Sequence, residues 1–124
     1  MRPSHACAFI GLLVNSSAAV SDQYSCAARP EIIAPCFDIR GRLSFWNGAP
    51  SARIWHVGTT RMLGVHNDNL PPEFATRVDG FDTEFWGTFT VCPLSKERAG
   101  HMQFVCIEAW SDISIRQRSS KVAN

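Results

Sequence analysis

The sequence lacks a long apolar run, and it lacks an excess of charge of either sign. Its main apolar stretch, residues 6–14, is far shorter than the roughly 20 residues that a membrane-spanning helix needs. Lys and Arg number 12 and Asp and Glu 11 in a chain of 124 residues. A nucleic-acid binder relies on a basic surface that releases counterions from phosphates. We therefore expect no membrane span and no nucleic-acid partner.

The sequence also lacks the short motifs of catalysis and metal binding. It contains no Gly-x-Ser-x-Gly elbow, no Walker loop, no His-Glu-x-x-His and no glycine-rich dinucleotide fingerprint. No pair of cysteines has the short Cys-x-x-Cys spacing that places two thiolates on one zinc ion. These absences favour a non-catalytic protein, and they predict neither a cofactor nor a bound metal.

Residues 1–19 have the organisation of a secretory signal peptide. A basic start at Arg2 precedes the apolar run, and small residues at 16–19 supply a cleavage site that places Ser17 and Ala19 at the −3 and −1 positions. Cleavage there gives a mature chain that begins at Val20. We therefore expect a periplasmic or extracellular protein, in which the loss of Arg2 leaves acidic and basic residues equal in number.

The cysteines fit the same compartment. Cys7 leaves with the signal peptide, and the remaining four predict two disulfides, as is common in small secreted domains: Cys26, Cys36, Cys92 and Cys106. If the strands at 84–92 and 101–110 form a hairpin, Cys106 lies opposite Gly87, too far from Cys92 for a bond. The sequence favours Cys36–Cys92 with Cys26–Cys106. It leaves open Cys36–Cys106 with Cys26–Cys92.

Alternating apolar and polar residues predict short β-strands through most of the remaining chain. These strands are expected at 37–46, 52–57, 61–66, 84–92, 102–110 and 112–116, with one helical turn at 73–77. Asn47-Gly48 is typical of a type I′ hairpin turn, and Pro50 delays the return strand. The predicted organisation is a signal peptide at 1–19, a lead-in segment at 20–35, a β domain at 36–116 and a polar tail at 117–124.

Short strands joined by Gly, Pro and Asn turns predict an all-β domain, in the form of a small antiparallel, immunoglobulin-like β-sandwich. An OB-type barrel is the alternative architecture. The segments Gly41-Arg-Leu-Ser-Phe-Trp-Asn-Gly-Ala-Pro50 and Asp82-Thr-Glu-Phe-Trp-Gly-Thr-Phe-Thr90 resemble the transthyretin-like group, which implies a sandwich. The motifs Arg-Gly-Arg-Leu-Ser and Arg-Ile-Trp are similar to those of small exported bacterial proteins of uncharacterised function, which implies export and no activity.

Two tryptophans are the candidate ligand-binding residues. By strand alternation, Trp46 and Trp86 lie on the side opposite Phe45 and Phe85, and an exposed aromatic row suits a sugar or a partner protein. The alternative is that a second sheet covers them. The sequence therefore predicts a non-catalytic exported module in binding or cell-envelope structure, with protein or carbohydrate as its partner.

The titratable residues give one alternative function and one expected ion pair. His56, His66 and Asp68 form the alternative site of a small hydrolase or metal-dependent enzyme, because imidazole binds metals and titrates near neutral pH. Glu108 interrupts an apolar strand, where a carboxylate needs a partner. A cross-strand ion pair with an arginine is expected there, and the candidates are Arg40, Arg42 and Arg53.

Overall fold

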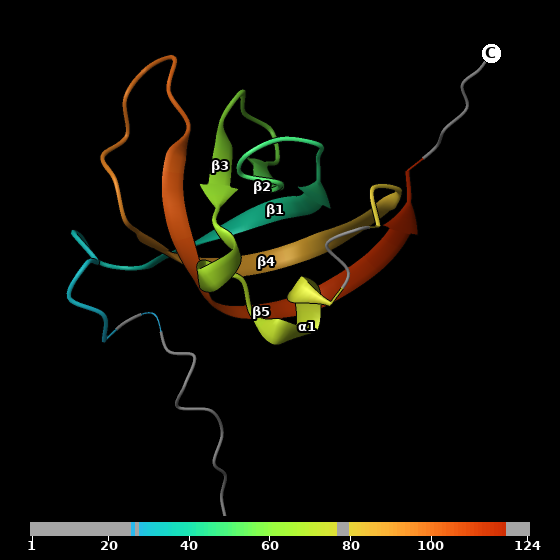
Figure 1. The fold of residues 1–124 in the computed structure, drawn as a ribbon, viewed down its shortest axis with the longest axis horizontal. Helices are drawn as coiled ribbons and strands as arrows, with labels where there is room; N and C mark the ends of the chain where they lie inside the picture. The colour runs from blue at the N-terminus through green and yellow to red at the C-terminus, as the bar shows by residue number, and fades with distance from the viewer. Residues whose placement is uncertain (1–25, 27, 77–79, 119–124) are drawn as a thin grey trace, which may run out of the picture.

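The computed structural model describes residues 26, 28–76 and 80–118 (Figure 1). The predicted signal peptide at 1–19 and its cleavage site before Val20 lie outside the described residues, as do parts of the lead-in segment and of the polar tail. Within the described part of the chain, no helix is long and apolar enough to span a membrane.

Five β-strands and two short helical segments make up the described fold. In chain order they are β1 (Phe37–Phe45), β2 (Ala52–His56), β3 (Met62–Val65), the 3₁₀ turn η1 (Asn67–Asn69), α1 (Pro72–Ala75), β4 (Thr83–Pro93) and β5 (Gln103–Gln117). The strands follow the alternation in the sequence, and α1 falls on the predicted helical turn. The predicted strands at 102–110 and 112–116 are one continuous strand, β5.

The strands form one closed barrel in the order β1-β2-β3-β5-β4 (Figure 1). β1 pairs with β2 along one edge and with β4 along the other, and β3 closes in parallel against β5 through Leu63↔Gln103 and Gly64↔Phe104. The predicted all-β class is confirmed. Within that class, the strands adopt the OB-type alternative and not two packed sheets, because every strand has a partner on both edges.

Aliphatic and aromatic side chains fill the inside of the barrel. Fully buried residues come from every strand, among them Leu43, Ile54, Leu63, Val91 and Val105. α1 begins at a proline, which suits a first helical turn because that turn needs no N–H from it. The helix inserts Phe74, whose ring centroid lies 5.1 Å from those of Phe85 and Trp110. α1 therefore completes the core beside β4 and β5.

Two register shifts bend β5 as it crosses β4, one between Trp86 and Thr88 and one between Thr90 and Val91. At the first shift Gly87 leaves no room for a side chain, because an added Cβ would lie 2.8 Å from the carbonyl oxygen of Ser111. Asp112, beside it, has a positive φ of 55°. Bulges increase the local bend and twist of a strand, which lets β5 pair with both β4 and β3.

The connection between β1 and β2 differs from the predicted type I′ turn. The loop covers residues 46–51 and closes through the N–H of Trp46, which donates to the carbonyl of Ser51 at 2.8 Å. Neither Asn47 nor Gly48 has the positive φ that a type I′ turn requires. The proline in the loop has no N–H to donate, so pairing resumes only after it.

The disulfides are Cys26–Cys106 and Cys36–Cys92, with Cα separations of 5.9 Å and 4.0 Å. The favoured pairing is therefore confirmed. The register used to argue for it is wrong, because Cys92, and not Gly87, lies opposite Cys106. Pairing between β4 and β5 starts directly at Pro93↔Val105, and β5 continues past the predicted strand end, so the whole ladder is displaced.

Candidate functional site

Tryptophan and arginine side chains gather on the outer surface of β2, β1, β4 and the end of β5. Neighbouring positions in a strand point to opposite sides, so positions that alternate with the buried Leu43, Ile54 and Phe85 face outward. The tryptophans and arginines in ring contact with one another on this side are here called the Trp/Arg face, and they are Trp46, Trp55, Trp86, Arg42, Arg53, Arg116 and Arg118. The ladder brings members from adjacent strands side by side.

Arg42 lies at the centre of the Trp/Arg face. In the ladder it stands opposite Trp55 of β2 and Trp86 of β4. Its guanidinium carbon lies 4.9 Å from the ring centroid of Trp55 and 5.7 Å from that of Trp86. The two indoles are 6.1 Å apart and nearly perpendicular, at 87°. Arg42 is therefore held against two aromatic rings, at about 0.5–1 kcal/mol for each cation–π contact near the surface.

Three further arginines lie over tryptophan rings of the face, one over Trp86 and two over Trp46. The guanidinium carbon of Arg116 is 4.5 Å from the centroid of Trp86. Those of Arg53 and Arg118 are 5.8 Å and 4.8 Å from the centroid of Trp46. Trp46 and Trp86 thus each contact two guanidinium groups, and the stacked layer extends from β2 to the end of β5.

Internal hydrogen bonds fix the three indole rings. The donors and acceptors are Trp46 Nε1 to Ser44 Oγ at 3.0 Å, Trp86 Nε1 to Glu84 Oε1 at 3.0 Å, and Trp55 Nε1 to the Thr59 carbonyl at 2.7 Å. A ring whose N–H is bonded and whose face carries a guanidinium has little freedom to turn. The Trp/Arg face is therefore a preorganised surface.

The guanidinium groups differ in how many of their donors are occupied. Arg53 Nε donates to a carbonyl oxygen of the β1–β2 loop at 2.9 Å, and Arg118 Nε lies 3.4 Å from the carboxylate of Glu84. Among the described residues, Arg42 and Arg116 have no hydrogen-bond or ion-pair partner, and Arg42 Nε is buried without one. Arg42 at the centre of the face and Arg116 on β5 therefore have N–H donors that no described residue accepts.

Both tryptophans singled out in the sequence belong to this face. Trp46 and Trp86 are half-buried on the outside of the barrel, where no second sheet covers them among the described residues. Sequence reasoning missed Trp55 and the arginines as members of the same surface. Their outward position follows from strand alternation, since Arg53 and Trp55 alternate with buried Ala52 and Ile54, but their contacts depend on the register of four strands.

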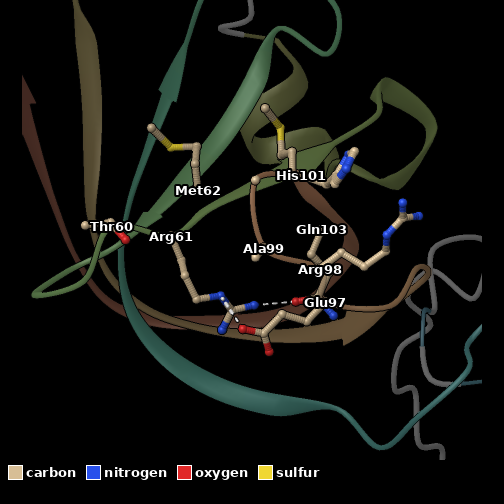
Figure 2. A pocket seen from close by; sticks show the side chains of 10 residues that line it. Thr60, Arg61, Met62, Glu97, Arg98, Ala99, His101 and Gln103 are labelled. Atoms are coloured by element: carbon tan, nitrogen blue, oxygen red, sulfur yellow. Dashed lines mark hydrogen bonds and ion pairs between the residues drawn. The ribbon is translucent and has the colours of Figure 1, made fainter.

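A cavity of about 410 Å³ lies between the β2–β3 turn and the β4–β5 loop (Figure 2). Arg61 crosses it, donating a hydrogen bond to the side-chain carbonyl of Gln103 and forming an ion pair with Glu97 at 3.3 Å. Arg98 and His101 come from the loop on its other side. The guanidinium of Arg61 is therefore already paired with Glu97 and bonded to Gln103. It offers a ligand fewer unpaired N–H donors than Arg42 and Arg116 do.

The histidines of the alternative enzyme site are not gathered into a cluster. Among the described residues, one group of three or more His, Cys, Asp and Glu side chains has its ligand atoms within 4.8 Å of one another, and it is Cys26, Cys92 and Glu108. His56, His66 and Asp68 are not part of it, and the ring of His66 stacks on Phe104 at 4.5 Å. Both cysteines are disulfide-bonded and supply no thiolate for a metal.

Glu108 has a different partner from the arginines expected for it. Its carboxylate accepts a hydrogen bond from the backbone N–H of Cys26 at 2.7 Å. Arg42 and Arg53 instead stack on the tryptophans, and Arg40 stands opposite Thr88. The prediction of an ion pair between Glu108 and one of these arginines is therefore wrong, because the barrel places them on different parts of the sheet.

Comparisons with known proteins add no assignment. No family model, no curated protein and no solved structure matches the chain. An OB-type topology does not by itself select a ligand, since one fold supports many functions. The residues of the site therefore carry the functional conclusion.

Proposed function

We propose that this domain is a non-catalytic binding module of the periplasm or the extracellular space, and that the Trp/Arg face is the surface that contacts its ligand. One observation carries the proposal. Arg42 and Arg116 lie over aromatic rings with no hydrogen-bond or ion-pair partner among the described residues, and Nη2 of the neighbouring Arg118 is buried without a partner as well.

The composition of the face supports a binding role. Trp and Arg are the residue types that most often dominate binding energy at protein surfaces, because they combine large contact area with directional donors. Here their side chains are already ordered by stacking and by the indole hydrogen bonds. Less conformational entropy is then lost when a ligand binds, which favours affinity.

The two disulfides support the proposed location. Cys26–Cys106 and Cys36–Cys92 pair all four cysteines of the mature chain. Disulfides persist in secreted and periplasmic proteins and are rare in reducing compartments. This agrees with the signal peptide predicted at 1–19.

Nuclear magnetic resonance of the four indole N–H groups tests the proposal. The mature protein is titrated with polygalacturonate, a neutral glucan, an oligothymidylate and an unstructured acidic peptide. We expect at least one probe to shift the indole signals of Trp46, Trp55 and Trp86 at micromolar to millimolar concentration. Trp110 packs on Phe74 in the core, away from the face, so its signal is the internal control.

Two outcomes contradict the proposed function. In one, no probe moves any indole signal of the face. In the other, binding shifts only the amides of residues around Arg61 and His101, which line the cavity at the other loops. The first result shows that the Trp/Arg face binds none of these ligand classes, and the second assigns ligand binding to the cavity.

A further inference from the structure

The ligand chemistry of the Trp/Arg face follows from how its arginines are held. A guanidinium that lies over an aromatic ring uses its flat face for the contact and keeps its N–H donors in the plane of the group. Arg42 and Arg116 both lie over the ring of Trp86, at 5.7 Å and 4.5 Å from its centroid. Arg42 on β1 and Arg116 on β5 therefore reach the Trp86 ring from the two strands that flank β4, and one extended ligand lying across these strands can meet both.

The charge of the face is one-sided although that of the whole chain is balanced. The chain carries a formal net charge of +1. The face contains four arginines, and among the described residues the one carboxylate bonded to its members is that of Glu84. Glu84 is already engaged by the indole N–H of Trp86 and by Arg118. The complementary ligand is an anion with several negative charges.

The occupied ring faces argue against nucleic acid. Single-stranded nucleic acids gain much of their affinity when bases stack on open aromatic faces. Trp46 and Trp86 each have two guanidinium groups within 6 Å of the ring centroid, so a base has to displace an arginine before it can stack. A carboxylate has no such requirement, because it binds to the in-plane donor edge of a guanidinium in the geometry that arginine favours.

We infer that the Trp/Arg face binds an acidic polysaccharide, with the uronate carboxylates received by the terminal N–H groups of Arg42 and Arg116 and the apolar faces of the sugar rings lying against the tryptophan edges. A polymer with a charge on every unit matches a row of cations that spans four strands. The inference rests on the proposed function and specifies its ligand. It concerns the outer surface of β2, β1, β4 and β5, and not the cavity near Arg61.

The experiment compares polygalacturonate with its fully methyl-esterified form, which keeps the sugar backbone and removes the charges. Isothermal titration calorimetry on the mature protein measures both affinities at low and physiological salt. We expect the acidic polymer to bind, the ester to bind at least tenfold more weakly, and the difference to shrink as salt rises.

Single-charge variants locate the binding site. Arg116→Gln and Arg42→Gln are each expected to weaken polygalacturonate binding by about tenfold, since each removes charge-assisted hydrogen bonds. Arg98→Gln removes one exposed guanidinium from the β4–β5 loop and is the matched control, expected to bind as the wild type does. Arg116 is exposed, so its substitution tests the inference even if Arg42→Gln lowers the melting temperature.

The outcomes separate the inference from the function on which it rests. Equal affinity for the acid and its ester overturns the inference, and so does tighter binding of an oligothymidylate than of polygalacturonate. In both cases shifts of the Trp46, Trp55 and Trp86 indole signals still support a binding face. An equal loss of affinity in Arg98→Gln and Arg116→Gln also overturns the inference, because it shows general attraction to charge without a site.

Discussion

The backbone N–H of Cys26 donates a hydrogen bond to the carboxylate of Glu108, and the side chain of Cys26 is bonded to Cys106 two residues earlier on β5. The lead-in segment is thus attached to the barrel by a covalent and a polar contact at the same place. Arg29 extends the attachment, because its guanidinium donates hydrogen bonds to Asn69 and to the carbonyl of Asp68 in η1.

Removing the Cys26–Cys106 bridge is expected to destabilise the domain substantially. The disulfide spans 80 positions of sequence, and loss of a native disulfide from a small domain costs about 2–5 kcal/mol. Guanidinium unfolding of the double variant Cys26→Ser/Cys106→Ser measures the loss. Glu108→Gln, which keeps the bridge and weakens the hydrogen bond, is expected to cost about 1 kcal/mol. Unchanged stability of the double variant contradicts this account, as does a Cys92–Cys106 crosslink in non-reducing peptide maps.

Gly87→Ala is expected to lower the free energy of unfolding by about 1–3 kcal/mol. An added Cβ there meets the carbonyl oxygens of Ser111 and Asp112 at 2.8 Å and 3.1 Å, and backbone atoms in a paired strand move only at a cost. Ser114→Ala, at an exposed position of the same strand, is the control and should stay within about 0.5 kcal/mol of the wild type. If both variants unfold at the same denaturant concentration, the bulge does not depend on glycine.

Glu84→Gln is expected to strengthen the binding of polygalacturonate by roughly three- to fivefold, about 0.6–1 kcal/mol. The substitution removes a negative charge from among the arginines, while the amide oxygen still accepts the hydrogen bond of Trp86. Calorimetry at low salt measures the gain. Glu73→Gln on α1, an exposed carboxylate away from the Trp/Arg face, serves as its counterpart and should leave affinity unchanged. A weaker complex for Glu84→Gln shows that the carboxylate has a different role.

The mature protein is expected to begin at Val20, because Ser17 and Ala19 supply the small residues that signal peptidase requires. Intact-mass measurement of the exported protein decides the point to within one residue. A cytosolic protein that keeps residues 1–19 and has free thiols at Cys36 and Cys92 contradicts this prediction. It also contradicts the proposed periplasmic or extracellular location.

The local pattern of the sequence was sufficient to predict the strands but not their closure. Alternation placed β1, β2, β3 and β4 to within two residues, because burial of every second side chain is a local property. Closure depends on the parallel pairs Leu63↔Gln103 and Gly64↔Phe104, which join segments far apart in the chain and leave no local signature. The bulge at Gly87 also hides the continuity of β5, since it shifts the alternation in the middle of the strand.

The sequence predicted two tryptophans of the candidate site but not their contacts with arginine, again because contacts between strands leave no local pattern. The alternation shows that Trp46 and Trp86 lie opposite the core side of their strands. It does not show that Arg42 has Trp55 on one side and Trp86 on the other, which requires the β1–β2 and β1–β4 registers together. Aromatic residues taken one strand at a time therefore indicate exposure, while their interleaving with arginine appears only once the ladder is known.

Closure of the sheet decides the manner in which this domain can hold a partner. In the order β1-β2-β3-β5-β4 each strand has a neighbour on either edge, but β3 pairs with β5 only at Gln103 and Phe104, so the rest of β5 has a strand partner on the β4 side alone. Among the described strands, an added peptide strand or a second copy could pair along this part of β5, while the short β2 and β3 are paired on both sides. On the Trp/Arg face, which lies over paired strands, recognition is left to side chains, so its specificity can change by surface substitution while the backbone hydrogen bonding stays the same.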